Sequence, residues 1–178
     1  MNINEQYLES IKKRFQDYKS LGEKSIDQLE PALLFKTFNE DSNSIATIVK
    51  HLWGNMLSRW TDFLTTDGEK SWRKRDAEFE NDIKSKEELM QKWNEGWACL
   101  FKTLDSLKPE QLSDIVKIRG EEHTVMDAIN RQLAHYPYHV GQIVYAAKIL
   151  KGGGFESLSI PKGQSKQFNV GMFGKEKK

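Results

Sequence analysis

The sequence predicts an all-α fold, a four-helix bundle with a small β-hairpin before the last helix. Four long segments repeat apolar residues every three or four positions, as helices with one buried face do. Capping or turn residues separate these segments, and one short β-branched stretch interrupts the helical period before the fourth. A chain of 178 residues suits one domain. We therefore expect a single domain over 1–178, with residues 155–178 as a C-terminal tail.

The first helix is indicated by apolar residues at helical spacing, namely Ile3, Tyr7, Ile11, Phe15 and Tyr18. Gly22 is expected to end it. A linking stretch over 29–40 is interrupted by Pro31. This long link permits a bundle topology other than simple up-and-down.

The second helix is expected to begin after one of the capping residues 42–44. Its apolar positions run from Ile45 to Phe63, and the turn dipeptide Asp67-Gly68 follows. The next segment, 69–82, is dense in charge and has no clean period. We expect a long ordered loop or very short elements there.

The third helix is predicted to follow the capping box that begins at Ser85, and to end before Pro109. Residues 115–125 then predict a hairpin that turns near Gly120. Thr124 can cap the fourth helix.

That fourth helix is expected to continue to the glycines at 152–154. Pro137 lies inside it and predicts a kink, because proline lacks the N–H that would bond the carbonyl of Leu133. The first part of the tail can pack on the domain, and its last few residues are expected to be loose.

Composition excludes several classes of function. Lys and Arg number 27 and Asp and Glu 26, so the formal net charge is +1, which argues against nucleic-acid binding. No run approaches the ~20 apolar residues of a membrane span, and the N-terminus lacks the pattern of a secretory signal. A single cysteine forms no internal disulfide, which favours an intracellular, cytoplasmic location.

The placement of the histidines is the most informative feature. His135 and His139 are spaced i, i+4, so one helix face presents both and two imidazoles can reach one metal ion. At about 100° per residue, these two and His51 fall on matching margins of the apolar faces of their helices. The margins can meet if the helices are neighbours. A histidine in such a position is more often a hydrogen-bonded boundary residue, so both interpretations stay open.

Two blocks resemble the DinB/YfiT-like superfamily: His-Leu-Trp-Gly-Asn-Met at 51–56 and His-Tyr-Pro-Tyr-His-Val-Gly-Gln at 135–142. The charged segment 67–78, the block 119–124 and the tail segment 159–163 are similar to one branch of it without a named function. The resemblance covers nearly the whole chain. It implies a four-helix bundle with a divalent metal, commonly zinc or nickel, on three histidines.

On this resemblance His51, His135 and His139 are the metal ligands. The superfamily includes thiol transferases that attach low-molecular-weight thiols such as bacillithiol to electrophiles, and others look like hydrolases or isomerases. A homodimer is also expected, from the family and from the tryptophan content.

Three neutral imidazoles leave an open metal position, where a water or a thiol can be deprotonated. We therefore expect a metal-dependent enzyme of the small-molecule thiol-transferase or hydrolase type, and the sequence does not choose between the two. The alternatives are a non-catalytic bundle that binds a metal or small ligand, and a metal-free interaction module.

Four polar residues are candidates for orienting the metal ligands or for binding a cosubstrate. Asn55 and Gln142 are expected to orient the ligand imidazoles, with ordinary boundary positions as the alternative. Arg73 and Arg75 can grip an anionic cosubstrate, although pairing with nearby acidic residues is the simpler explanation. Cys99 is expected to be a packed core residue rather than a nucleophile.

Overall fold

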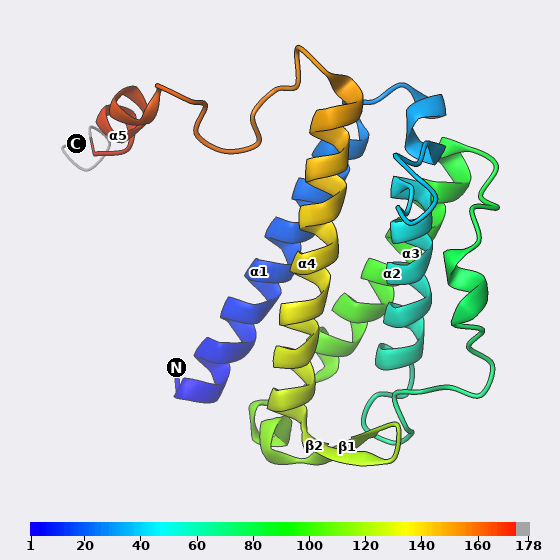
Figure 1. Ribbon diagram of the computed structural model, residues 1–178. Coiled ribbons are helices and arrows are strands. Elements are labelled where there is room, and N and C mark those ends of the chain that lie inside the picture. The colour runs from blue at the N-terminus through cyan, green and yellow to red at the C-terminus, as the bar shows by residue number, and fades with distance from the viewer. Residues whose placement is uncertain (174–178) are drawn as a thin grey trace.

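The computed structural model describes residues 1–173, and it is mostly helical (Figure 1). Its helices are α1 (Ile3–Ile26), α2 (Ile45–Trp60), α3 (Lys86–Ser106), α4 (Val125–Lys151) and α5 (Ser165–Phe173). An antiparallel hairpin of β1 (Ile115–Ile118) and β2 (Glu121–Thr124) precedes α4. Three short 3-10 helices are η1 (Pro31–Phe35), η2 (Asp76–Phe79) and η3 (Pro109–Ser113). The predicted hairpin is confirmed, whereas α5 was not expected.

Side-chain caps fix where the long helices begin. Ser44 accepts a hydrogen bond from the Thr47 amide at 3.1 Å, and Ser85 accepts one from the Glu88 amide at 3.2 Å. Thr124 caps α4 in the same way, at 3.1 Å from the Asp127 amide. Each bond satisfies an amide that the first helical turn leaves without a partner. These three predicted starts are confirmed.

Two helix ends differ from the sequence prediction. Gly22 does not end α1, which continues to Ile26. This glycine instead admits the Trp93 ring, because a Cβ there would lie 2.6 Å from ring atom Cζ2. The second helix ends at Trp60, and Phe63 is buried beyond it. The fourth helix is continuous through Pro137, and the kink expected there stays a prediction.

The four long helices share one apolar core. Helix α2 packs against α3 and α4, and α1 packs against α4 and α3. The largest fully buried side chains include Trp60, Trp93, Trp97, Tyr136 and Phe15. Burying each such side chain stabilises the fold by roughly 1.5–3 kcal/mol. This packing places one face of α2 opposite one face of α4.

A buried hydrogen-bond chain joins α2 to α4. The indole N–H of Trp60 donates to the Tyr136 hydroxyl at 2.9 Å, and that hydroxyl donates to Asn55 Oδ1 at 3.1 Å. Buried polar groups without partners destabilise a fold, so these two hydrogen bonds fix the register between α2 and α4. That register sets the spacing of the histidines.

The segment between α2 and α3 lies along α2 and contains η2 (Figure 1). Its first turn is joined to the β-hairpin, where Asp67 accepts hydrogen bonds from the amides of Arg119 at 2.8 Å and Gly120 at 2.7 Å. Both hairpin-turn residues have positive φ, 57° for Arg119 and 79° for Gly120, as tight hairpins require. The expectation of a long ordered segment with short elements is confirmed.

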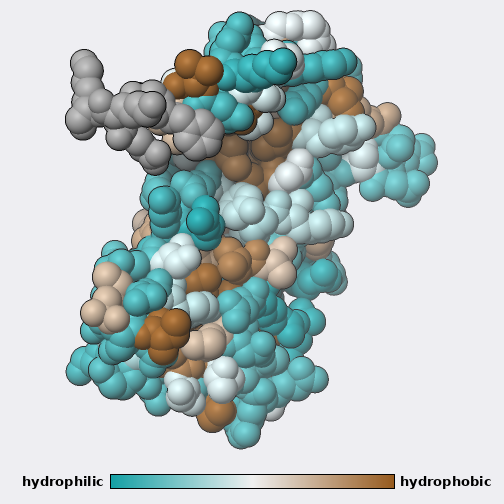
Figure 2. All heavy atoms as spheres, turned by 90° about the vertical axis from the view of Figure 1, so that its left-hand side faces the viewer, coloured by the Kyte–Doolittle hydropathy of each residue, from teal (hydrophilic) through white to brown (hydrophobic). Residues whose placement is uncertain are grey.

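The tail divides into two parts. Phe155 packs against the core, and the Glu156 amide bonds Gln28 at 2.7 Å. Beyond this, α5 projects from the helices (Figure 1), and its side chains through Met172 are exposed. Figure 2 views this side of the molecule and shows apolar surface in a hollow, where a cavity of about 420 Å³ lies between α1 and α4. The residues predicted to be loose lie partly beyond 173, outside the described residues.

Within residues 1–173, no helix combines the length and apolar character that a membrane crossing needs.

Candidate metal centre

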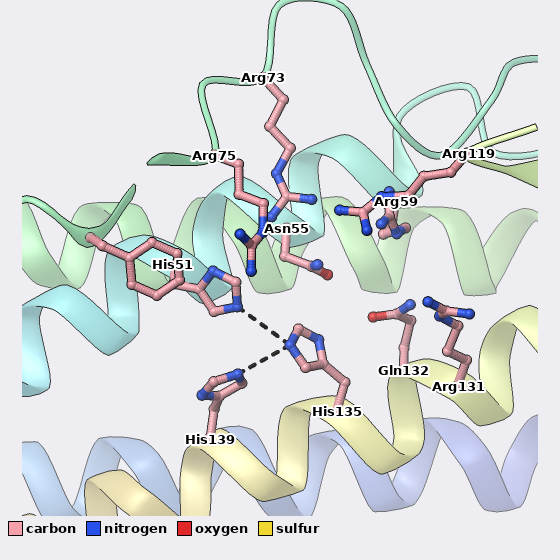
Figure 3. A pocket seen from close by; sticks show the side chains of 11 residues that line it. His51, Asn55, Arg59, Arg73, Arg75, Arg119, Arg131, Gln132, His135 and His139 are labelled. Carbon is pink, nitrogen blue, oxygen red and sulfur yellow. Dashed lines mark hydrogen bonds between the residues drawn. The ribbon is translucent and has the colours of Figure 1, made fainter. Parts of the chain in front are cut away.

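Three histidines from two helices converge at one point (Figure 3). His51 comes from α2, and His135 and His139 come from α4. The Nε2 atom of His135 lies 3.3 Å from Nε2 of His51 and 3.1 Å from Nε2 of His139. One nitrogen from each ring lies within 4.8 Å of the other two. The set could hold a metal ion.

The spacing of these nitrogens fits the chemistry of zinc. Zn–N bonds of about 2.0–2.1 Å in a tetrahedral site place neighbouring ligand atoms about 3.3 Å apart. The two Nε2 separations in this cluster, 3.3 and 3.1 Å, are of that size. Two of the three separations therefore already match those around a small divalent ion, and the third is at most 4.8 Å.

Hydrogen bonds on the outer side of two rings determine which nitrogen faces the centre as an acceptor. Glu78 Oε2 lies 2.9 Å from Nδ1 of His51, and Gln142 Oε1 lies 3.2 Å from Nδ1 of His139. Both oxygens are acceptors, so each Nδ1 carries the proton and each Nε2 turns its lone pair inward. Metal-bound histidines usually have this arrangement.

The protonation states also suit metal binding. Burial, followed by the neighbouring His139 ring, lowers the pKa of His135 from 6.5 to about 3. Burial and the nearby His51 ring lower the pKa of His139 to about 4. Both rings are therefore neutral at pH 7, and a neutral imidazole is the form that binds metals.

Glu78 is the functional residue that sequence reasoning missed. It lies on η2 and is buried, and its carboxylate also accepts bonds from Arg73, 2.7 Å from Nε and 2.9 Å from a terminal nitrogen. Burial alone would raise its pKa, but hydrogen bonds from His51 and Arg73 hold that pKa below its ordinary value. Glu78 is thus a charged acceptor for His51.

The signal for Glu78 in the sequence was weak, because it lies in a segment with many charges. Its position depends on Gly54, one turn after Lys50 on α2. A Cβ at Gly54 would lie 2.7 Å from the carboxyl carbon of Glu78. The glycine therefore gives the carboxylate room to reach His51.

A pocket of about 340 Å³ opens over the histidines. It is lined by His51, Asn55, Arg59, Arg73, Arg75, Phe79, Arg119, Arg131, Gln132, His135 and His139. No carboxylate is among these lining residues. Such a volume suits a small molecule.

The two arginines predicted for anion recognition differ in environment. The Arg73 side chain is 2 % exposed and is bonded to Glu78, so internal pairing is the correct interpretation for it. Arg75 is exposed and lines the pocket, with its guanidinium 5.4 Å from the Phe79 ring centroid. Both arginines line the pocket, but among residues 1–173 only Arg75 of this pair forms no ion pair.

The other residues singled out in the sequence differ in whether they contact the histidines or line the pocket. Gln142 bonds His139 as described, whereas Asn55 lines the pocket and bonds Tyr136 rather than a histidine. Cys99 is partly buried, and burial raises the pKa of its thiol. It does not line the pocket. The fourth histidine, His123, lies away from this centre: its side chain is 14 % exposed and contacts Asp127 at 2.6 Å.

Comparison with known proteins gives one family. Searches among curated proteins and among solved structures find no significant match. Residues 2–164 match the family described as "Protein of unknown function (DUF1572)". The match includes all three histidines, Glu78 and every residue of the pocket. The chain therefore belongs to the DUF1572 family.

Proposed function

We propose that this protein is a metal-dependent enzyme that activates a thiol or a water to attack a small-molecule electrophile. The observation that supports this proposal most directly is that nitrogens of three histidines converge in an open pocket. His51, His135 and His139 would hold the ion, with zinc or nickel as the expected metals. A structural zinc site is closed by four protein ligands, and only three converge here among the described residues.

A divalent ion on three neutral imidazoles keeps its full charge and an open position, which lowers the pKa of a thiol or water bound there. The chain supplies the remaining conditions. Glu78 and Gln142 fix two of the three ligand rings, those of His51 and His139. Cys99 is outside the pocket, so the sulfur of a thiol reaction must come from a cosubstrate. This favours a transferase for two small molecules, or a hydrolase.

The proposal also covers the superfamily to which the chain belongs, its oligomeric state and its location. We assign the chain to the DinB/YfiT-like superfamily and its four long helices to that four-helix bundle, because the histidine blocks lie on α2 and α4 as the resemblance requires. We also propose a cytoplasmic homodimer without nucleic-acid partners. Light scattering measures the oligomeric state directly.

The test is turnover of a small electrophile by zinc-loaded and nickel-loaded protein, with and without a low-molecular-weight thiol. Thiol-dependent consumption supports the transferase, and thiol-independent consumption supports the hydrolase. His139→Gln should abolish either activity, whereas His123→Gln should keep it. Metal-loaded protein that turns over no electrophile in either condition would contradict an enzymatic role and leave a metal-binding protein.

A further inference from the structure

The pocket over the histidines carries more positive charge than its neighbours neutralise. Five of its lining residues are arginines. Glu69 binds Arg59 at 3.2 Å and Arg119 at 3.1 Å, and Glu78 binds Arg73. Within residues 1–173, Arg75 and Arg131 form no ion pair.

These two unpaired arginines lie near the metal centre on different elements. Arg131 precedes His135 by four residues on α4, so it shares a face with that ligand. Arg75 lies over the Phe79 ring, whose centroid is 5.0 Å from that of His51. Figure 3 shows the two guanidinium groups at opposite sides of the pocket, that of Arg75 near His51 and that of Arg131 beside Gln132.

A third residue of the pocket is a buried amide with an unused acceptor. Gln132 is 3 % exposed, and its Oε1 has no hydrogen-bond partner within the part of the chain that the structure describes. Figure 3 shows this amide facing Asn55 and Arg59 across the pocket. A buried acceptor without a partner costs free energy, so a bound molecule with an O–H or N–H group would remove that cost.

We infer that the substrate of the proposed enzyme is a small oxyanion, a carboxylate or phosphate, that also carries an O–H or N–H donor. Arg75 and Arg131 bind the anionic group, since guanidinium groups bind oxyanions with charge-assisted hydrogen bonds. Gln132 accepts from the donor. The anion is thereby held beside the three histidines. This inference rests on the proposed function, because the substrate bound there would react at a metal ion held by the three histidines.

Calorimetric titration of the zinc-loaded protein with inorganic phosphate and with sulfate tests the inference. Both ions are tetrahedral, but near neutral pH only phosphate retains an O–H. Phosphate should bind more tightly than sulfate, and Gln132→Met should remove the difference. Arg75→Gln and Arg131→Gln should each weaken phosphate binding about tenfold or more.

Arg14→Gln is the matched control, because Arg14 is exposed on α1 and its one ion pair among residues 1–173 is with Asp17 at 3.5 Å. It should bind phosphate as the wild type does. Zinc content is measured on every sample, so loss of metal is distinguished from loss of the anion site. If the wild-type protein takes up no zinc after loading but still binds phosphate through the arginines, the anion site stands and the proposed metal enzyme is overturned. Wild-type affinity in both arginine variants, or no saturable phosphate binding, would overturn the inference.

Discussion

The three histidines differ in how the protein holds each ring. Glu78 fixes His51 and Gln142 fixes His139, while Nδ1 of His135 has no hydrogen-bond partner among residues 1–173. Outer partners of this kind orient a ligand and raise its basicity. The charged carboxylate is the stronger of the two acceptors. The site therefore depends on Glu78 more than on Gln142.

Replacing Glu78 by Gln tests this dependence. The amide keeps the shape but loses the charge that orients His51, so metal affinity should fall by about 10–100-fold. Competition with a chromogenic chelator measures it. Glu80→Gln, two residues away and exposed, is the control and should bind metal like the wild type. Equal affinities in both variants would remove Glu78 from the site.

Protonation of the ligand rings predicts how stability depends on pH without metal. The folded-state pKa values of His135 (about 3) and His139 (about 4) lie below the ordinary 6.5. As the pH falls below about 6.5, the unfolded chain binds protons that the folded chain does not, so the free energy of unfolding decreases.

The chelator-treated protein should therefore lose stability between pH 7 and pH 4, as urea unfolding measures. The double variant His135→Gln/His139→Gln should show a flatter dependence, because carboxylates contribute equally to both proteins. Parallel curves for the two proteins would show that these rings are not buried in the neutral form.

At the level of helices and loops, the sequence predicted what local rules determine. The caps at Ser44, Ser85 and Thr124 and the hairpin turn at Gly120 depend on residues close in sequence. The pairing of His135 with His139 follows from helical spacing alone. The sequence predicted that His51 approaches them only if the two helices are neighbours, because the approach depends on how α2 packs against α4.

Glu78 and the end of α1 show what local rules cannot predict. Gly22 has the residue type of a helix stop, yet the Trp93 ring from α3 covers it and the helix continues. Glu78 reaches the centre because η2 packs on α2 beside Gly54. Both outcomes are tertiary contacts between segments far apart in sequence.

Gly54 gives a prediction at this scale. Gly54→Ala should displace Glu78, because the added Cβ would lie 2.7 Å from its carboxyl carbon and 3.1 Å from Cγ. Metal affinity should decrease as it does in Glu78→Gln. Gly141→Ala on α4 is the control: apart from its chain neighbours and the adjacent helix backbone, no atom of the described residues lies within 4 Å of the added Cβ. This substitution should raise helix stability by up to about 1 kcal/mol. Unchanged metal binding in Gly54→Ala would show that the carboxylate does not need this space.

At the scale of the whole molecule, the packed helical domain is distinct from the C-terminal helix α5, which projects from it. The family match ends at residue 164, just before α5, and the side chains of α5 through Met172 are exposed. A protein ending at residue 164 should therefore keep the melting temperature and metal affinity of the full chain. Calorimetry and chelator competition check both. A large drop in melting temperature would show that α5 stabilises the domain, for instance within an oligomer.

Metal content of the purified, untagged protein tests the three-histidine centre most directly. After zinc loading and dialysis, elemental analysis should find one zinc per chain in the wild type and in His123→Ala. His51→Ala, His135→Ala and His139→Ala should each lose most of the metal while circular dichroism shows the same helix content. If these three folded variants keep as much zinc as the wild type, the centre is not where the ion binds.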